Sequence, residues 1–217
     1  MIKIDLITGF LGAGKTTFIK HYARDCISRG ERICILENDF GAVNVDMMLL
    51  QDMVGENCDM EMVAGGCDAD CHRRRFRTKL ISMGMLGYDR VIVEPSGVFD
   101  MDEFFDTLRE DPLDRWYEIG SVIAIVDENI DEDMSPDVKY VLATEVAHAG
   151  KLVFSHVGEG QADRATAIIN DSLQAIKCPR RITAEDIIEK EWTEFTQKDF
   201  DRIRAAGYVI ADYEKRD

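Results

Sequence analysis

The sequence predicts a doubly wound α/β fold, in which a mostly parallel β-sheet lies between two layers of helices. Short apolar runs rich in β-branched residues recur along the chain, and stretches whose apolar residues repeat at helical spacing separate them. Parallel strands need such crossover connections. The 217 residues suffice for one domain with a well-buried core and a short extension.

The expected strands are short and largely apolar, as buried parallel strands are. They are residues 2–7, 32–38, 90–94, 121–127 and 151–154. Apolar residues at helical spacing predict a helix over 18–27 and two further helices over 138–149 and 163–176. Strand and helix therefore alternate through most of the chain.

A C-terminal extension follows the last of these helices. We expect one main domain over residues 1–180 and an extension of the same domain over 181–217. Thr183 and Thr196 each precede an aspartate by three positions, as in the capping boxes that open short helices. The apolar run at 208–211 predicts an edge strand.

The stretch between the first strand and the first helix is rich in glycine and fits the phosphate-binding pattern GxxxxGK[ST]. Glycines let consecutive backbone N–H groups turn toward phosphate oxygens, Lys15 brings positive charge to the β- and γ-phosphates, and Thr16 offers a hydroxyl to Mg²⁺. The candidate nucleotide-binding residues of this stretch are Gly9, Gly12, Ala13, Gly14, Lys15, Thr16 and Thr17. We therefore expect a P-loop NTPase fold of three α/β/α layers that binds a nucleoside triphosphate with Mg²⁺.

A second site element follows the third expected strand, in Glu94-Pro95-Ser96-Gly97. A carboxylate at a strand end binds Mg²⁺ directly or through water, and a glycine N–H near the γ-phosphate changes its contact when that phosphate leaves. Lys15, Glu94 and Gly97 are therefore catalytic candidates, and Thr16 and Glu94 are candidate magnesium ligands. The alternative is an ordinary turn at a strand exit, which Pro95 also fits.

Acidic residues also end the second expected strand, in Glu37-Asn38-Asp39-Phe40-Gly41, and Asp46 follows. In an open parallel sheet this edge carries the site. Carboxylates here are candidates to hold Mg²⁺, to position the attacking water or to ligate another metal, and spacing alone does not divide these roles. We take Asp39 as the third candidate magnesium ligand.

The segment from residue 58 to 77 gathers thiols, carboxylates and an imidazole, among them Cys58, Cys67, Asp68, Asp70, Cys71 and His72. Cys67, Cys71 and His72 are candidate ligands for Zn²⁺, Co²⁺ or Ni²⁺. A structural zinc site usually uses a CxxC pair and a second pair elsewhere, which this chain lacks, so the set suits transient loading. The alternative is a loop with two free thiols.

The chain is acidic, with 42 Asp and Glu against 26 Lys and Arg and a net charge of −16. This charge disfavours non-specific binding to nucleic acid or anionic membranes and suits a cationic partner or a metal ion, although a solvated acidic surface that keeps the protein soluble is the simpler explanation. No signal-peptide pattern opens the chain, and no apolar run approaches the ~20 residues of a membrane span. We expect a cytoplasmic protein whose six cysteines are reduced.

At these motifs the chain resembles the CobW-type P-loop GTPases, relatives of the GTPases that insert nickel into urease and hydrogenase. The resemblance covers residues 1–160. It rests on four motifs in order: Gly9 through Thr17, Glu37 through Gly41, the Gly66-Cys67 segment, and Glu94 through Gly97. It implies a metallochaperone role, in which GTP binding and hydrolysis gate the release of a metal to a client metalloprotein.

Carried over position by position, the resemblance makes Lys15 and Thr16 ligands of phosphate and Mg²⁺. It makes Glu37, Cys67 and Cys71 metal-ligand candidates. Related GTPases pair across their nucleotide faces, so a homodimer is the candidate assembly.

The thiol motif departs from the family pattern GCxCC, because it is stretched to Cys67-Asp68-Ala69-Asp70-Cys71-His72. One thiol is missing unless His72, Asp70 or Cys58 replaces it. The metal preference therefore stays open.

The base-recognition motif departs as well, since Ser155-His156-Val157-Gly158 stands where the family has [NT]KxD. Ser155 and His156 remain nucleotide-binding candidates. Gly158 cannot supply the carboxylate that accepts hydrogen bonds from guanine, and Glu159 compensates only if the loop shifts. Since the sequence ends at Asp217, we also expect no room for the second domain of many family members.

Our leading interpretation is a slow nucleoside triphosphatase, with GTP as the first candidate substrate and ATP as the second. One alternative is a nucleotide-dependent sensor or interaction module with little hydrolysis, because the base-recognition loop is degenerate. Another is a small-molecule kinase on the same scaffold, although no arginine-rich lid segment follows the third strand.

Overall fold

The computed structural model describes residues 1–10, 12–39, 45–65, 68–95, 101–158 and 160–215. The chain divides into two compact units. The first unit comprises Met1–Ile7 and Thr16–Gly120, and the second comprises Thr8–Lys15 and Ser121–Asp217. The first strand, β1 (Ile2–Gly9), therefore begins in the first unit and ends in the second.

Four parallel strands form the sheet of the first unit in the order β3-β2-β4-β1. Besides β1 they are β2 (Ile33–Asp39), β3 (Cys58–Ala64) and β4 (Arg90–Pro95). In the register of β2 with β4, Glu37 lies opposite Glu94. Residues in register on adjacent strands point to the same face, so two acidic side chains meet near the carboxyl ends of these strands.

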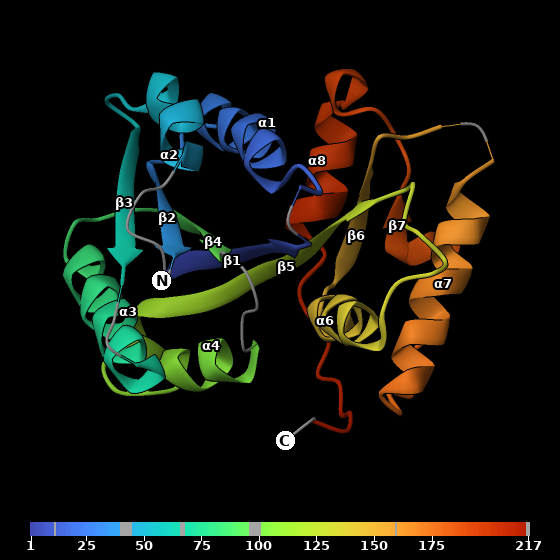
Figure 1. The fold of residues 1–217 in the computed structure, drawn as a ribbon. Coiled ribbons are helices and arrows are strands. Elements are labelled where there is room, and N and C mark those ends of the chain that lie inside the picture. Colours follow the sequence, from blue (N-terminus) through green and yellow to red (C-terminus); the bar gives the residue numbers. More distant parts are fainter. Residues whose placement is uncertain (11, 40–44, 66–67, 96–100, 159, 216–217) are drawn as a thin grey trace. The chain divides into compact units, whose positions relative to one another are not determined.

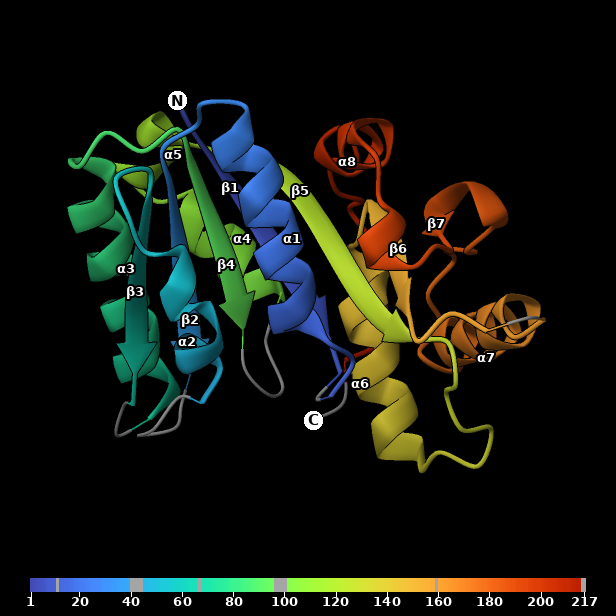
Figure 2. The same ribbon diagram turned by 90° about the horizontal axis from the view of Figure 1, so that it is seen from above.

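Helices cover both faces of this sheet, with α1 and α2 on one face and α3 and α4 on the other (Figures 1 and 2). The helices are α1 (Lys15–Ser28), α2 (Val45–Leu50), α3 (Ala69–Gly84), α4 (Met101–Leu108) and the short α5 (Leu113–Trp116), and a 3₁₀ turn, η1, spans Gln51–Met53. The apolar residues of α1 that repeat at helical spacing, such as Phe18, Ile19 and Ala23, are fully buried. The first unit is thus a three-layer α/β/α arrangement.

A buried ionic network joins three elements of the first unit. Arg90 of β4 pairs with Asp5 of β1, and both side chains are almost completely buried. Tyr22 of α1 donates its hydroxyl hydrogen to Asp5 Oδ2 at 2.7 Å, and Arg90 Nε donates to Glu31 Oε2 at 3.0 Å. A side chain at Gly120 would collide with the Asp5 carboxylate, so this position requires glycine.

The strand order continues from the end of β1 through β5 (Tyr117–Asp127), which begins in the first unit and ends in the second, to β6 (Lys151–Ser155) and β7 (Ile187–Ile188) of the second unit. The pairings of β5 with β6 and of β6 with β7 are parallel. Its helices are α6 (Pro136–Ala147), α7 (Ala162–Ala175) and α8 (Gln197–Arg204), with 3₁₀ turns η2 (Ala184–Asp186) and η3 (Trp192–Glu194). Within this unit α8 lies on one face of the strands, and α6 and α7 pack together on the other (Figure 1).

The predicted fold class is confirmed, because the described strand pairings are parallel and helices lie on both faces. The five predicted strands correspond to β1, β2, β4, β5 and β6. Both predicted capping boxes are present, at Thr183 with Asp186 and at Thr196 with Asp199. No helix in the part of the chain that the structure describes is long and apolar enough to cross a bilayer.

The prediction of an edge strand at residues 208–211 is wrong. Tyr208 forms an isolated antiparallel bridge with Ala149, and the edge of the sheet is β7. Ile187 and Ile188 are 8% and 2% exposed, whereas Ile210 is 75% exposed. The outer edge of β6 is already paired with β7, and the later apolar run bonds instead to the segment before β6, where the Val209 N–H donates to His148 O at 2.9 Å.

We predict that Arg90→Leu lowers the free energy of unfolding by about 3–5 kcal/mol, because it leaves the Asp5 carboxylate buried without its partner. Urea denaturation measures the change. Arg115→Leu is the matched control, since it breaks an exposed pair with Asp111 whose loss costs at most about 1 kcal/mol. Equal effects of the two substitutions would contradict the structural role given to Arg90.

Candidate functional site

The glycine loop after β1 adopts backbone conformations that only glycine takes readily. Gly9, Gly12 and Gly14 have φ values of 138°, 83° and 92°. A Cβ at Gly9 would collide with the backbone oxygen of Ile125, and one at Gly14 would lie 2.7 Å from Cη2 of Trp192. The three glycines that the motif singled out are therefore required by backbone conformation or by close packing.

Lys15 folds back over this loop. Its side chain is largely buried, and Nζ donates to the carbonyl oxygens of Gly9 at 2.9 Å and Phe10 at 3.4 Å. The Ala13 N–H donates to Phe10 O at 3.1 Å, which closes the turn. The ammonium group is thus held at the loop by carbonyl acceptors, which are weaker partners than the oxygens of a phosphate.

Glu145 of α6 is a buried carboxyl group that sequence reasoning missed. It is 3% exposed, and no described residue donates a hydrogen bond to Oε2. Burial raises its pKa to about 7, and the positive charge of Lys15 opposes that rise. Its position within the apolar spacing of α6 left no signal that would mark it as a site residue.

The first unit holds the magnesium candidates Thr16 and Glu94. Thr16 Oγ1 donates to Glu94 Oε1 at 2.9 Å, and both side chains are buried. Glu37, which is 2% exposed, stands in register with Glu94 on the neighbouring strand. Thr17, the next residue of the motif, is exposed.

This donor set fits Mg²⁺. Thr16, Glu37 and Glu94 offer hard oxygen ligands, which Mg²⁺ prefers. Two buried carboxylates on adjacent strands also repel each other unless a cation or a proton lies near them. The third magnesium candidate, Asp39, ends β2, but its side chain lies outside the described residues, as do Gly97 and Cys67.

His72 is held by two bonds inside the first unit. Its Nδ1 lies 3.0 Å from Gly65 O, and its Nε2 lies 2.7 Å from Asn38 Oδ1 of β2. Gly65 O only accepts, so Nδ1 carries a proton. A metal at Nε2 would have to displace Asn38. The structure therefore gives His72 a place in fixing the β3–α3 connection to β2.

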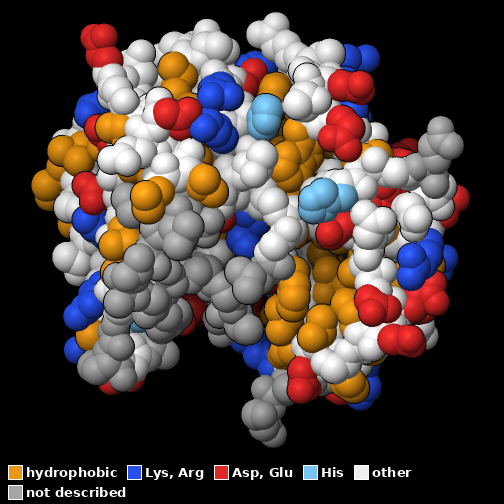
Figure 3. Space-filling model, turned by 45° about the horizontal axis from the view of Figure 1, so that its top comes forward, with side chains coloured by type: hydrophobic (Ala, Val, Ile, Leu, Met, Phe, Trp, Pro, Cys, Tyr) orange, Lys and Arg blue, Asp and Glu red, His pale blue; other side chains and the backbone are white. Residues whose placement is uncertain are grey.

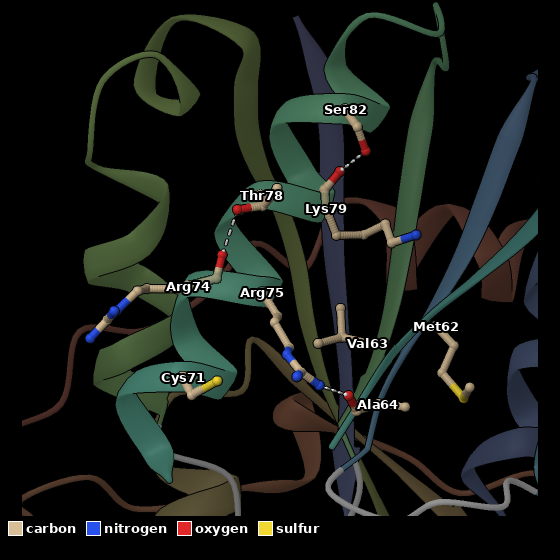
Figure 4. A pocket seen from close by; sticks show the side chains of 9 residues that line it. All are labelled: Met62, Val63, Ala64, Cys71, Arg74, Arg75, Thr78, Lys79 and Ser82. Carbon is tan, nitrogen blue, oxygen red and sulfur yellow. Dashed lines mark hydrogen bonds between the residues drawn. The ribbon is translucent and has the colours of Figure 1, made fainter. Parts of the chain in front are cut away.

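Cys71 lies apart from this buried bond, on a groove between β3 and α3. The groove has a volume of about 490 Å³, and Figure 4 shows Cys71 near one end of it with cationic residues of α3 beyond. Its lining residues are Met62, Val63, Ala64, Cys71, Arg74, Arg75, Thr78, Lys79 and Ser82. Arg75 Nη1 donates to Ala64 O at 2.7 Å, and Lys79 pairs with Glu61 at 2.7 Å. The Cys71 thiol is half-buried and reachable from this groove.

The described metal candidates of the first unit lie in different surroundings. Glu37 is buried on β2, His72 bonds to Asn38, and Cys71 lies on the β3–α3 groove. Among the residues with described side chains, no three His, Cys, Asp or Glu lie close enough to hold one metal ion. The assignment of Glu37, Cys67, Cys71 and His72 as metal ligands remains a prediction.

In the second unit, an apolar hollow of about 280 Å³ adjoins the phosphate loop. Figure 3 shows one face of the molecule, on which apolar side chains gather with acidic side chains among them. Phe10, Gly12 and Ala13 of the loop meet residues from the end of β5 and from α6 there, among them Ile125 and Leu142. The lining also includes the polar residues Asp127, Asn129 and Asp131.

The loop after β6 carries the nucleotide candidates Ser155 and His156. Ser155 is buried, and its hydroxyl donates to Val126 O at 3.5 Å. His156 has a positive φ of 52°, and its Nδ1 lies 3.0 Å from Asp127 Oδ2. Asn129 Nδ2 donates to His156 O at 3.3 Å, so the ends of β5 and β6 are tied together.

These features define a P-loop nucleotide-binding fold, in which a glycine loop with an inward lysine joins the first strand of a parallel sheet to a helix. The family model described as "CobW/HypB/UreG, nucleotide-binding domain" matches residues 3–184. The chain belongs to this family, which confirms the resemblance noted in the sequence.

Two curated relatives illustrate the match. Zinc chaperone YjiA of Escherichia coli (strain K12) is 28% identical over 173 residues, which are 75% of this chain and 52% of that protein. Zinc-regulated GTPase metalloprotein activator 1 of Schizosaccharomyces pombe is 24% identical over 192 residues, which are 83% of this chain and 45% of that protein. The chain spans about half the length of these relatives.

Among solved structures, the signal recognition particle receptor FtsY from Elizabethkingia anophelis in complex with GDP aligns with a TM-score of 0.55 and 15% identity. The alignment covers 94% of this chain and 64% of FtsY. At this identity the likeness shows the fold alone.

We predict that Glu145→Gln stabilises the protein at high pH. The Glu145 carboxyl has a pKa of about 7 in the folded protein and of 4.5 in the unfolded chain, so the folded state holds the proton more tightly. As the pH rises from 4.5 to about 7, the unfolded chain loses this proton first, and the folded state becomes less stable. The variant should be more stable by about 3 kcal/mol at pH 8 and equal to wild type near pH 4. Urea denaturation at both pH values measures this, with the exposed Glu118→Gln as control. A difference that does not change with pH would refute the raised pKa.

Proposed function

We propose that the protein is a nucleoside triphosphatase that uses GTP and couples nucleotide binding and hydrolysis to the trafficking of a transition metal. The observation that carries this proposal is the phosphate loop, in which glycines with positive φ hold the Lys15 ammonium against carbonyl oxygens. The family match over residues 3–184 supports it and is compatible with the proposed extension of the same domain over residues 181–217.

Lys15 would exchange its bonds to Gly9 O and Phe10 O for phosphate oxygens of the bound nucleotide. A charge-assisted bond to phosphate is stronger than a bond to a neutral carbonyl, so the exchange favours binding. Backbone N–H groups of the loop and the amino end of α1 would complete the anion site.

Thr16, Glu94 and Glu37 would hold Mg²⁺, with Thr16 bound directly and the carboxylates bound directly or through water. Bound Mg²⁺ supplies positive charge to the phosphate oxygens as the γ-phosphoryl group leaves. The hydrogen bond from Thr16 Oγ1 to Glu94 Oε1 would be given up if the hydroxyl oxygen held the ion. Glu94 can then orient the attacking water, a role that it shares as a candidate with Asp39.

The transition metal would be the ion that the protein carries and releases. The relatives named zinc chaperones make Zn²⁺ the first candidate, with Co²⁺ and Ni²⁺ as further candidates. Cys71 and Cys67 would bind it as thiolates, with Glu37 and His72 as additional ligands. The accessible Cys71 thiol supports a site that can load and release its metal, and a client metalloprotein would be the recipient.

The second candidate function is a nucleotide-dependent sensor that binds but scarcely hydrolyses. The absence of a side chain at Gly158, in the base-recognition loop, favours it. Steady-state turnover of GTP and ATP, measured with and without Zn²⁺, Co²⁺ or Ni²⁺, separates the two functions. Nucleotide turnover that is faster with metal than without it supports the GTPase. The absence of turnover under every condition supports the sensor.

We predict that Lys15→Ala weakens binding of Mg²⁺-GTP by at least about 100-fold, since it removes charge-assisted bonds to two phosphates. Titration with a fluorescent GTP analogue measures the affinity. Lys20→Ala is the control on the same helix, because Lys20 pairs with the exposed Asp52 and is not part of the loop. Unchanged affinity in Lys15→Ala would show that the phosphate loop is wrongly assigned.

We predict that Cys67→Ala/Cys71→Ala weakens Zn²⁺ and Co²⁺ binding by more than about 100-fold. Removing a residue that only hydrogen-bonds to a metal ligand lowers metal affinity by about 10- to 100-fold, and removing the ligands themselves should lower it further. Competition with a chromogenic chelator measures the affinity, and the thiolate absorption of bound Co²⁺ should disappear. Cys178→Ala is the matched control, since Cys178 is a buried thiol of the second unit. Retention of the Co²⁺ absorption by the double variant would refute the ligand assignment.

A further inference from the structure

Glu128 places a buried carboxylate beside the loop that follows β6. The residue is 1% exposed, and its N–H donates to Ser155 O at 3.0 Å, which fixes it at the end of β5. Glu128 Oε2 accepts a hydrogen bond from the Gly158 N–H. No described residue donates a hydrogen bond to Oε1. Because burying a carboxylate oxygen without a donor is costly, Oε1 indicates a ligand that brings N–H groups.

Gly158 leaves room for such a ligand next to Glu128. A Cβ added at Gly158 would lie 3.9 Å from Gln161 Cγ and 4.0 Å from Glu128 Oε2, both ordinary contact distances. The Glu128 carboxylate therefore lies where a side chain at residue 158 would extend. An acidic group stands at this place although Gly158 itself carries none.

An aromatic ring connects this loop to the phosphate loop within the second unit. Trp192 Nε1 donates to Phe154 O at 3.1 Å, one residue before Ser155. The same indole ring packs on Gly14, where a Cβ would lie 2.7 Å from Cη2. Aromatic rings beside a phosphate site offer a surface on which a nucleobase stacks.

Negative charge gathers around Glu128. Burial raises the pKa of Glu189, and the neighbouring carboxylates of Glu128 and Asp163 raise it further. Such surroundings favour a base edge that presents only hydrogen-bond donors.

We propose that Glu128 is the base-selecting residue of this protein and accepts hydrogen bonds from the N1–H and N2–H groups of guanine. The proposal rests on the proposed function, because the base must belong to a nucleotide whose phosphates lie in the glycine loop. Guanine presents two adjacent donors, which match one carboxylate. Adenine presents the lone pair of N1 on the corresponding edge, which the carboxylate repels. Glu128 thus supplies the acceptor that Gly158 lacks.

The decisive variant is Glu128→Gln, tested by titration with GDP, ADP and XDP in the presence of Mg²⁺. Glutamine keeps one oxygen for the Gly158 N–H and replaces the other by an amide donor. GDP affinity should fall about 10- to 100-fold, because bonds to a charged acceptor are lost, while ADP affinity changes by less than about threefold. XDP affinity should rise at least about tenfold, since its C2 carbonyl accepts from the amide.

A relocation variant tests the place of the carboxylate. Gly158→Asp in the Glu128→Gln background returns an acidic group to the same space, and the preference for GDP over ADP should recover to within about tenfold of wild type. Glu132→Gln is the control, because Glu132 is an exposed acid of the same β5–α6 connection and pairs with Arg164. It should leave all three affinities unchanged.

Wild-type protein supplies a test that needs no variant. IDP lacks the N2 amino group, so it should bind about tenfold more weakly than GDP. The proposal is overturned if wild-type protein binds GDP and IDP equally. It is also overturned if Glu128→Gln weakens the binding of GDP, ADP and XDP alike, because Glu128 would then only hold the loop. Wild-type protein that binds GDP and ADP equally through Lys15 overturns base selection but leaves the phosphate-loop function standing, whereas a protein that binds no nucleotide refutes both.

Discussion

The first unit depends on the burial of the Arg90–Asp5 ion pair, because a charge left alone in this core would cost several kcal/mol. The pair holds β4 against β1, and Tyr22 connects α1 to it through Asp5. Side chains four residues apart on a strand point to the same face, so Glu94 stands on the same face of β4 as Arg90. There it meets Thr16 in the first turn of α1. The helix is therefore bonded to the sheet at its first turn and near its middle, and the bond at its first turn is part of the proposed magnesium site.

In the second unit the main structural requirement is a phosphate loop whose backbone N–H groups can bind an anion. Glycines at positions 9, 12 and 14 permit the backbone conformation, and the packing of Ile125 and Trp192 against two of them holds it. Lys15 folded on its own loop carbonyls keeps the cation in place before a ligand arrives. The loop is thus organised in advance by the protein, and phosphate replaces weaker acceptors.

Acidic groups in the interior carry the chemistry that we propose. Glu37 and Glu94 are matched to a hard cation, and Glu128 is matched to the donors of a base. Glu145, whose pKa burial raises to about 7, has no such ligand assigned and reduces stability at neutral pH. The two buried carboxyl groups thus differ in the roles that we propose for them. Glu128 follows the carboxyl end of β5, whereas Glu145 lies on α6.

The sequence by itself determined the fold class, five of the strands and the phosphate loop, because period, glycine placement and capping pairs such as Thr183 with Asp186 are local properties. It did not identify β3 and α3 in the thiol-rich segment, nor β7. The two strands it missed, β3 and β7, are the edge strands of the sheet, and their place depends on which strand edge remains open. Only the tertiary structure brought Glu128 to Gly158, 30 residues further along the chain. It also bonded His72 to Asn38 while it placed Cys71 on the β3–α3 groove. Side chains adjacent in sequence diverge on a helix, while those at the ends of parallel strands converge, and this convergence decides which groups can share a ligand.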